Sequence, residues 1–239
     1  MSPEDVTAHV RRLWRHRGTT LRTPRRGPRQ QLDLDEILDA AVALADAEGL
    51  AAVSTRAVAA RFGKTAMALY PYVGDKGQML ALMLDHASVL PSWTDPGTSP
   101  ADDLSAWALA FLELHLAHPW LTSLSWARAA PGPHEQDWLE RLLAILDRWA
   151  TPAAMRSPTI TMLYATVRSC AETAAAYRTF DSGDAAQWRE GADATRRLIP
   201  DLAERYPLTA ALPPVTADWR QAPREGLLAA VRLIAAALP

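Results

Sequence analysis

The stretch STRAVAARFGKTAMALYPYVGDK, residues 54–76, decides the fold, and the rest of the 239-residue chain is organised around it. Ser54 is a good N-cap for a helix over 54–62, because its hydroxyl can accept a hydrogen bond from an N–H group of the first turn. Gly63 follows that helix, at a place where a left-handed residue ends a helix at low cost. The stretch therefore predicts a short helix and then a tight turn.

A second short helix is expected over 65–70, with Thr65 as its N-cap. Pro71 is expected to end it, because proline lacks the backbone N–H that a helix interior needs. A third helix begins near Lys76. Two helices joined by so tight a turn must cross at close range, and the small side chain of Ala59 suits the crossing point. This layout predicts a helix-turn-helix, whose second helix enters the major groove of DNA.

The surrounding sequence resembles the N-terminal domain of the TetR family of bacterial transcriptional regulators. The resemblance runs from Leu34 to Leu80, and spacing and residue type agree over several consecutive segments. The segments are IL-x-AA at 37–41, EGL at 48–50, STRAVAARFG at 54–63, ALY at 68–70 and DKGQML at 75–80.

The resemblance implies which side chains meet DNA. Arg56 matches a position that contacts bases, and its guanidinium can bridge guanine O6 and N7. Lys64 stands where the family usually has an apolar residue, and its ammonium is expected to reach a phosphate while its stem covers the core. Tyr72 replaces a common histidine but keeps a hydroxyl donor. The full predicted DNA-binding set is Thr55, Arg56, Lys64, Thr65, Ala66, Met67, Tyr70, Tyr72, Lys76, Arg25 and Arg26.

Residues 1–30 form a basic N-terminal arm. They carry eight arginines against Glu4 and Asp5, a formal charge of +6, so the remainder carries −8 to give the overall −2. A short helix is expected over 3–16 and an irregular segment over 18–30. A basic arm on an acidic body suits a polyanion, and Arg25 and Arg26 are predicted to contact phosphates or the minor groove. The alternative is a tail whose arginines only improve solubility.

An all-α fold with two domains follows. Residues 31–80 are expected to form the three-helix DNA-binding domain, beginning with a helix over 33–48 whose Asp33 and Glu36 resemble a capping box. Residues 81–239 are expected to form a helical ligand-binding and dimerisation domain. Further helices are predicted over 77–90, 101–117, from Pro119, 134–150, 158–180, 184–205 with a break at Pro200, and 223–238.

A homodimer is expected, because one short recognition helix makes too few contacts to read an operator. The resemblance assigns the interface to the helices at 158–180 and 223–238. An alternative is that their apolar seams fill the chain's own core. The seam residues are Ala171, Ala174, Ala175, Leu227, Val231, Ile234 and Leu238.

The second domain is predicted to bind a small-molecule effector that is apolar or aromatic. Eight of the nine tryptophans lie at position 93 or beyond, and aromatic walls suit a flat apolar ligand. Core packing is the competing interpretation for each of these residues. The candidate walls are Trp107, Phe111, His115, Trp120, Trp126, Met162 and Tyr164.

No cofactor and no enzyme activity are predicted, since a nucleophile elbow, a glycine-rich phosphate loop and an HExxH motif are all missing. His115 and His118 near Glu113 allow a metal interpretation, but a core histidine and a helix-end histidine explain them better. The single cysteine, Cys170, suits a reducing cytoplasm, and no membrane span is expected.

The sequence thus predicts a cytoplasmic repressor that a small molecule releases from its DNA operator. The alternative function is a helical ligand-binding sensor whose helix-turn-helix no longer binds DNA. An enzyme is the more distant third possibility.

Overall fold

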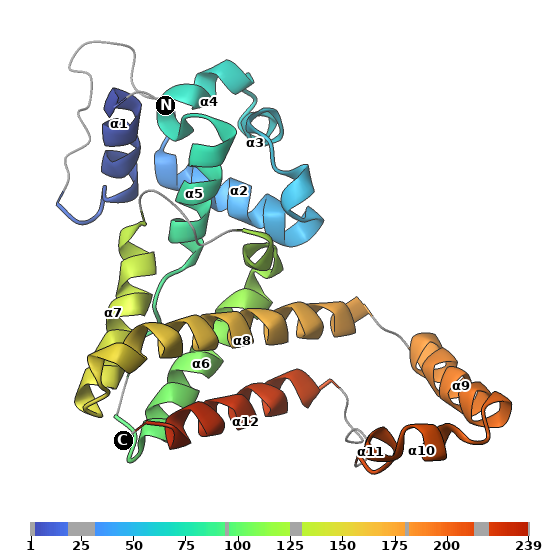
Figure 1. Cartoon of the computed structure of the whole chain (residues 1–239). Helices are drawn as coiled ribbons and strands as arrows, with labels where there is room; N and C mark the ends of the chain where they lie inside the picture. Colours follow the sequence, from blue (N-terminus) through green and yellow to red (C-terminus); the bar gives the residue numbers. More distant parts are fainter. Residues whose placement is uncertain are drawn as a thin grey trace, which may run out of the picture.

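The computed structural model describes residues 3–18, 32–93, 96–124, 131–179, 182–212 and 220–238, and helices are the regular elements throughout these ranges (Figure 1). The predicted all-α class is confirmed. Within the same residues, no helix has the length and apolarity that crossing a bilayer requires. The elements are α1 (Pro3–Leu13), α2 (Leu34–Glu48), η1 (Leu50–Ala52), α3 (Thr55–Arg61), α4 (Ala66–Val73), α5 (Lys76–Ala87), α6 (Pro100–Ala117), η2 (Pro119–Ser123), α7 (Pro133–Arg148), α8 (Ala153–Thr179), α9 (Ser182–Leu198), α10 (Leu202–Arg205), α11 (Pro207–Ala210) and α12 (Ala222–Ala236).

The helix-turn-helix consists of α3 and α4. Ser54 Oγ accepts from the N–H of Ala57 at 3.1 Å, which confirms the predicted N-cap. Gly63 has φ +63° in the turn, a value that favours glycine. Val58, Ala59 and Leu69 are fully buried between the two helices and the rest of the N-terminal core.

Two details of α4 differ from the prediction. Thr65 occupies the N-cap position, but its hydroxyl makes no capping hydrogen bond. The helix also continues through Pro71 to Val73, so the predicted end at Pro71 is wrong. Proline removes one hydrogen bond there, and burial of Val73 four residues after Leu69 offsets that loss.

The N-terminal caps of α2 and α5 differ from the caps that the sequence predicts. Asp33 caps α2, but it accepts from the N–H of Asp35 at 2.7 Å, so the predicted box with Glu36 is not made. A complete capping box instead begins α5, where Asp75 and Gln78 each accept from the other's backbone N–H. Gly49 ends α2 with φ +82°, as predicted.

The long helix α8 starts at Ala153, so the prediction that Pro158 opens it is wrong. Arg156 explains the earlier start, since it donates to the Thr151 carbonyl at 3.1 Å and to Asp147 at 2.8 Å. These bonds tie the first turn of α8 to the end of α7. The predicted helix from Pro119 is a 3₁₀ helix, η2, over the part that the structure describes. The predicted break at Pro200 is confirmed, between α9 and α10.

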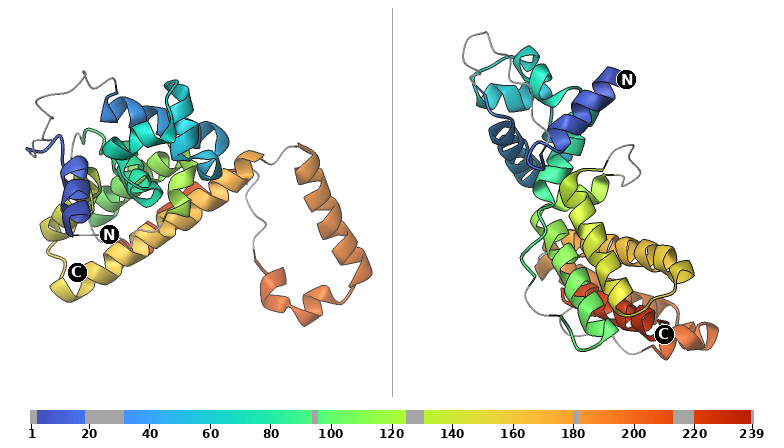
Figure 2. Two further views of the ribbon diagram at one scale, coloured as in Figure 1. Left: turned by 90° about the horizontal axis from the view of Figure 1, so that it is seen from above. Right: turned by 90° about the vertical axis from the view of Figure 1, so that its left-hand side faces the viewer.

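The buried side chains form two clusters. The first joins α1 through α5, and it also takes in Trp120, Leu121 and Leu124 from the later part of the chain. The second lies between α6, α7, α8 and α12. The right-hand view of Figure 2 shows these two parts one above the other, with α5 reaching down from the first. We propose the division into residues 31–80 and 81–239 on this basis, with α5 shared between the parts.

The predicted dimer seams are used within the chain. Ala171, Leu227 and Val231 are at most 1% exposed and belong to the second cluster. That part of the interface prediction is wrong, because α8 and α12 pack these side chains against α6 and against each other. Their opposite faces carry exposed Met162 and Leu233.

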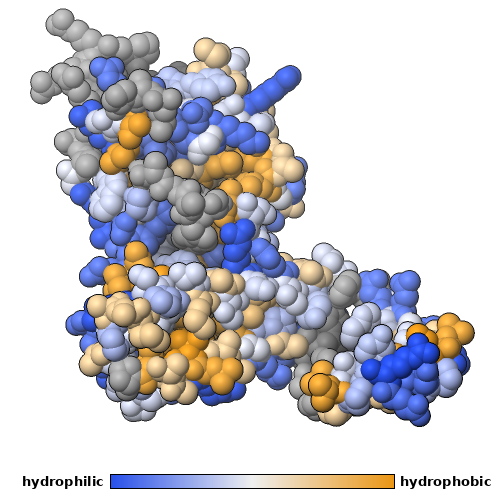
Figure 3. Space-filling model, viewed as in Figure 1, coloured by the Kyte–Doolittle hydropathy of each residue, from blue (hydrophilic) through white to orange (hydrophobic). Residues whose placement is uncertain are grey.

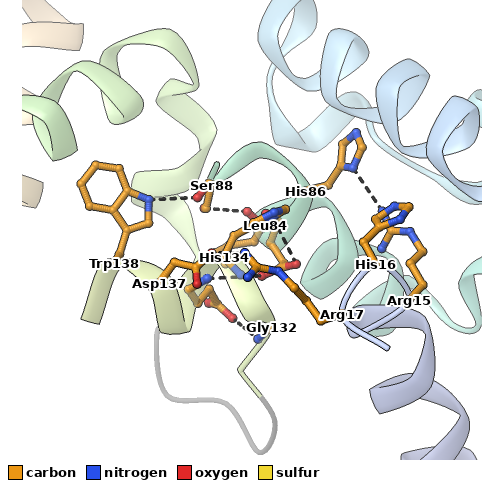
Figure 4. Close-up of polar contacts among 12 residues, drawn as sticks. Arg15, His16, Arg17, Leu84, His86, Ser88, Gly132, His134, Asp137 and Trp138 are labelled. Atoms are coloured by element: carbon orange, nitrogen blue, oxygen red, sulfur yellow. Dashed lines mark hydrogen bonds and ion pairs between the residues drawn. The ribbon is translucent and has the colours of Figure 1, made fainter. Parts of the chain in front are cut away.

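The end of α5 is hydrogen-bonded to α7, and we call this contact the α5–α7 joint (Figure 4). Asp85, 2% exposed, accepts from the N–H groups of His134 at 2.8 Å and Glu135 at 3.3 Å, so its carboxylate caps α7. The indole N–H of Trp138 donates to the Ser88 carbonyl at 2.9 Å, just beyond the last turn of α5. The joint thus ties the last helix of the N-terminal part to the second cluster.

A second contact, the α2–η2 joint, lies on α2. Asp46 accepts from the Trp120 indole N–H at 2.7 Å and from His118 Nδ1 at 2.9 Å. Arg168 of α8 donates to the carbonyls of Thr122 and Leu124, which fixes η2 from the other side. The two joints together hold the N-terminal part on the helical body.

Helices α9, α10 and α11 stand away from the body as an arm between α8 and α12 (Figures 1 and 2). None of their described side chains is buried, although the arm contains Trp188, Leu198, Tyr206 and Leu208. Large apolar side chains exposed in this number are typical of a surface that binds a partner.

Gly132 allows the close approach in the α5–α7 joint, because a Cβ there would lie 2.1 Å from Oδ1 of Asp85. Its φ of −81° suits alanine, so the cost of substitution is steric. Gly132→Ala is expected to lower the free energy of unfolding by roughly 1–3 kcal/mol, the usual cost of overpacking. The matched control, Gly226→Ala in α12, meets nothing within 4 Å and should be neutral or stabilising by up to about 1 kcal/mol. Urea unfolding followed by circular dichroism measures both, and equal midpoints would contradict the steric argument.

Candidate DNA-binding and effector sites

The surface of α3, α4 and the start of α5 carries most of the predicted DNA contacts. Met67 is 74% exposed and Tyr70 43% exposed, on a helix whose Leu69 and Val73 are fully buried. Because the apolar side chain of Met67 is exposed, it is available to contact a thymine methyl group. The exposed members of the predicted set are Arg56, Lys64, Thr65, Met67, Tyr70 and Lys76.

The other predicted contacts in this region are half-buried: Thr55, Ala66 and Tyr72. Tyr72 packs against the first cluster, so its ring belongs partly to the core. Thr55 and Ala66 are the first residues of α3 and α4. Both helices therefore present their N-terminal turns beside the exposed side chains, and free N–H groups there can bind phosphate.

The N-terminus of α5 is less suited to phosphate than the sequence suggested. Asp75 already accepts from the N–H of Gln78 at 2.8 Å, and its carboxylate adds negative charge beside Lys76. Lys76 is therefore the group at this end that suits a phosphate, with fewer open N–H groups to assist it.

The predicted contacts Arg25 and Arg26 lie outside the described residues. The preceding helix, α1, is described, and it lies along the N-terminal part with Leu13 only 2% exposed in the first cluster. Arg15 of the same segment is almost fully buried, and it donates to Asp35 of α2 at 2.5 Å and approaches His86 Nδ1 of α5 at 3.2 Å. Some of the basic side chains in residues 1–18 therefore form contacts that hold this segment in place.

A cavity of about 350 Å³ opens between α1 and the α4–α5 region. Polar and charged groups dominate its lining, including Asp5, Arg12, Asp75 and Gln78. Such a lining does not match the apolar effector pocket that the sequence predicted. The cavity lies beside Tyr70, on the side of α4 next to α1.

Four of the predicted effector residues meet in the second cluster, and Trp138 joins them. Phe111 stacks with Trp107 at a ring-centroid distance of 4.9 Å and meets Tyr164 at 5.0 Å. It also contacts the His115 ring at 4.6 Å and the Trp138 ring at 4.9 Å. We call this set of five side chains the aromatic cluster: Trp107, Phe111, His115, Trp138 and Tyr164.

The indole N–H of Trp107 and Nδ1 of His115 have specific partners in the aromatic cluster. The indole N–H of Trp107 donates to the Trp138 carbonyl at 3.1 Å, and His115 Nδ1 donates to the Phe111 carbonyl at 2.8 Å. Burial lowers the pKa of His115, so its imidazole is neutral near pH 7. Burial also raises the pKa of Tyr164, with a further contribution from Glu135, so its hydroxyl stays protonated. The side chains of the aromatic cluster are therefore uncharged near pH 7.

The remaining predicted wall residues lie elsewhere. Trp120 packs in the first cluster, where its indole N–H serves Asp46 in the α2–η2 joint. Met162 is 53% exposed on the outer face of α8, and Trp126 lies outside the described residues. His118 turns to Asp46 while His115 faces Phe111, so the two do not converge. Among the described residues, no group of three or more His, Cys, Asp or Glu could hold a metal ion.

Sequence reasoning missed Asp85 and Trp138. Asp85 is the one carboxylate in α5, set on the apolar side of KGQMLALMLDHA, and that placement was the available signal. Trp138 lies within the helix that the sequence predicts over 134–150. Its double role, in the aromatic cluster and in the α5–α7 joint, depends on tertiary packing.

The family model for "Bacterial regulatory proteins, tetR family" matches residues 37–83, which contain α3, α4 and most of α2 and α5. The segment that contains the helix-turn-helix therefore matches the TetR family. The "HTH-type transcriptional repressor DrrR1" of Streptomyces coeruleorubidus is 39% identical over 150 residues, covering 59% of this chain and 52% of that protein. An "HTH-type transcriptional regulator" of Saccharopolyspora erythraea is 35% identical over 106 residues, covering 43% and 44%. The chain thus spans about half the length of the curated relatives that it matches.

Solved structures of Streptomyces coelicolor proteins share the fold. The Streptomyces coelicolor protein ActR in complex with actinorhodin gives a TM-score of 0.69 at 23% identity, covering 87% of this chain and 97% of ActR. A putative transcriptional regulator from Streptomyces coelicolor A3(2) gives 0.63 at 22% identity, covering 87% and 100%. The similarity extends well beyond the matched N-terminal segment, into the helical body.

Arg56 is exposed on the first helix of the TetR helix-turn-helix, where its guanidinium is accessible to a base edge. Arg56→Ala is expected to cost roughly 1–3 kcal/mol of binding and to relax specificity at one base pair in each half-site. Competition between duplexes that differ at single base pairs measures this. An equal loss on every sequence would assign Arg56 to a phosphate.

Lys64 lies in the exposed turn between the two helices. Lys64→Val is expected to reduce the slope of log binding constant against log salt by roughly one, because one phosphate contact is lost. Sequence preference should not change. Titrations at several salt concentrations test this, and an unaltered slope would place the ammonium away from the DNA.

Proposed function

We propose that this chain is a DNA-binding transcriptional repressor of the TetR family that a small-molecule effector releases from its operator, acting in the cytoplasm where its DNA target lies. The observation that carries the proposal is the exposed face of α3 and α4. It presents Arg56, Met67 and Tyr70 to the outside, while Val58 and Leu69 anchor the same two helices in the core. A sensor without DNA binding would not need a guanidinium and a large apolar side chain exposed together at this face.

The same proposal includes a homodimer. The outer faces of α8 and α12 expose Met155, Met162 and Leu233, and apolar surface lies over this part of the body in Figure 3. The arm of α9, α10 and α11 begins at α8 and returns to α12 with its apolar side chains exposed. A second copy seated on α8 and α12 would cover both surfaces, and it would present two recognition helices roughly 34–36 Å apart.

The effector part of the proposal rests on the aromatic cluster. Its five side chains are neutral and tightly packed, and one of them, Trp138, donates to Ser88 at the end of α5. An effector acts only if it binds the DNA-incompetent state more tightly than the competent one. A flat, neutral aromatic molecule that separates these rings would displace Trp138 and therefore the end of α5. ActR, which shares the fold, binds actinorhodin, so actinorhodin is a sensible first compound to test.

Selection of duplexes from a random-sequence library by the full-length protein tests the DNA-binding function. We expect recovery of a two-fold symmetric site, bound with a strong dependence on salt. Sedimentation of the protein with and without the selected duplex gives the stoichiometry. If no duplex is enriched while a co-purifying molecule is found by mass spectrometry, the sensor function replaces the repressor.

Effector release is expected to depend on the aromatic cluster. Phe111→Leu, and Phe111→Ala if it folds, should abolish release from the selected duplex by the active compound, identified by testing actinorhodin and any co-purifying molecule. Operator affinity should be retained, because Phe111 is far from α3 and α4 in the chain and lies in the second cluster. Trp107→Ala provides a second test at the stacked ring.

Met162→Ala is the matched control for these variants, because Met162 was predicted from sequence but lies on the outer face of α8. It should leave release unchanged. If the Phe111 and Trp107 variants are folded by circular dichroism and the compound still releases them from the duplex, the effector site lies elsewhere.

A further inference from the structure

We propose that the ligand-binding body and the DNA-binding domain communicate through the α5–α7 joint, with Trp138 as the positioning residue that connects them, and not through the α2–η2 joint. This inference deepens the proposed function and rests on it. Each joint contains an indole N–H that donates to the N-terminal part, at Ser88 or at Asp46, so the joints differ in what else each tryptophan touches.

Trp138 belongs to the aromatic cluster and to the joint at once. Its ring lies 4.9 Å from Phe111 and 5.8 Å, edge-on, from Trp107, and its carbonyl accepts from the Trp107 indole. Its own indole N–H holds the Ser88 carbonyl at the end of α5. A displacement of Phe111 or Trp107 therefore moves a group that is bonded directly to α5.

The first turn of α7 makes the connection stiff. The Asp85 carboxylate caps that turn, and His134 Nδ1 donates back to the Asp85 carbonyl at 2.8 Å. Glu135 in turn accepts from the Gly132 N–H at 2.9 Å, which fixes the chain entering α7. With bonds at Asp85 and at Ser88, the last turn of α5 is held at two points and follows α7 as one body.

The turn that follows α1 also contributes to this joint. Arg17 donates to Asp137 of α7 at 2.5 Å, and Arg15 approaches His86 of α5 (Figure 4). Arg15 also donates to Asp35 of α2. The N-terminal segment therefore bonds to α7 and to the DNA-binding domain together. A movement of α7 is transmitted to α2 as well as to α5, and both helices pack against α3 or α4.

Among the described residues, no ring contact joins Trp120 of the α2–η2 joint to the aromatic cluster. Trp120 packs in the first cluster, and the rings that contact one another in the second cluster do not include it. Its indole N–H reaches Asp46 of α2, whose other partner is His118. This joint supports the DNA-binding domain without receiving the displacement of Phe111.

The test uses the reciprocity of coupling, since a site that controls DNA binding must itself respond when DNA binds. Hydrogen exchange is measured by mass spectrometry on the full-length protein, with and without the duplex selected by the wild type. In the wild type, the duplex should slow exchange in residues 66–87 and also in residues 133–148. Trp138→Phe keeps the ring but removes the N–H donor, and it should lose the protection at 133–148 while keeping it at 66–87.

Trp120→Phe is the matched variant, with the same loss of one indole donor at the other joint, and it should keep both protections. Gly132→Ala provides a second disruption of the α5–α7 joint if Trp138→Phe does not fold. Protection at 133–148 that survives Trp138→Phe and Gly132→Ala, or that is lost in Trp120→Phe instead, would overturn the inference while duplex binding stands. Absence of any duplex binding by the wild type would refute the proposed function itself, and the inference with it.

Discussion

The buried carboxylate of Asp85 is the contact on which the arrangement of the two parts depends. A carboxylate that is 2% exposed is costly, and burial raises its pKa even though the N–H groups of His134 and Glu135 favour the charged form. The first turn of α7 offsets that cost, because its open N–H groups and the positive end of the helix dipole face the carboxylate. α5 and α7 each leave a polar group that the other satisfies, and neither can withdraw without exposing that group unpaired.

The aromatic cluster explains how such a joint can be stable and still respond. Aromatic rings at centroid distances of 4.6–5.8 Å fill their space closely, so an added molecule cannot enter without moving one of them. The indole donors of Trp107 and Trp138 are both used on backbone carbonyls. Movement of a ring therefore carries backbone with it, and packed elements of this kind change between discrete arrangements.

The arm and the outer faces of α8 and α12 differ from the two buried clusters. Their large apolar side chains are exposed, although the chain has buried comparable residues elsewhere. The inner faces of the same two helices are consumed by the second cluster, through Leu163, Val167 and Leu227. One face of α8 and of α12 therefore packs in the chain's own core, and the opposite face is apolar and exposed. A second copy of the chain would bury that exposed face.

Local chemistry let the sequence by itself determine the all-α class and the place of the helix-turn-helix in the chain. The Ser54 cap, the left-handed Gly63 and the resemblance over residues 34–80 depend on neighbours within a few positions along the chain, and those signals are legible in one dimension. Proline was a poorer guide, since Pro71 and Pro158 both lie within helices whose other contacts offset one missing hydrogen bond. Only the tertiary structure decided which of the aromatic residues meet, which seam of α12 faces inward, and that Asp85 and Trp138 join the two parts. These partners are about 50 residues apart in the chain, and whether a side chain is core, joint or surface is fixed by the helix that packs against it.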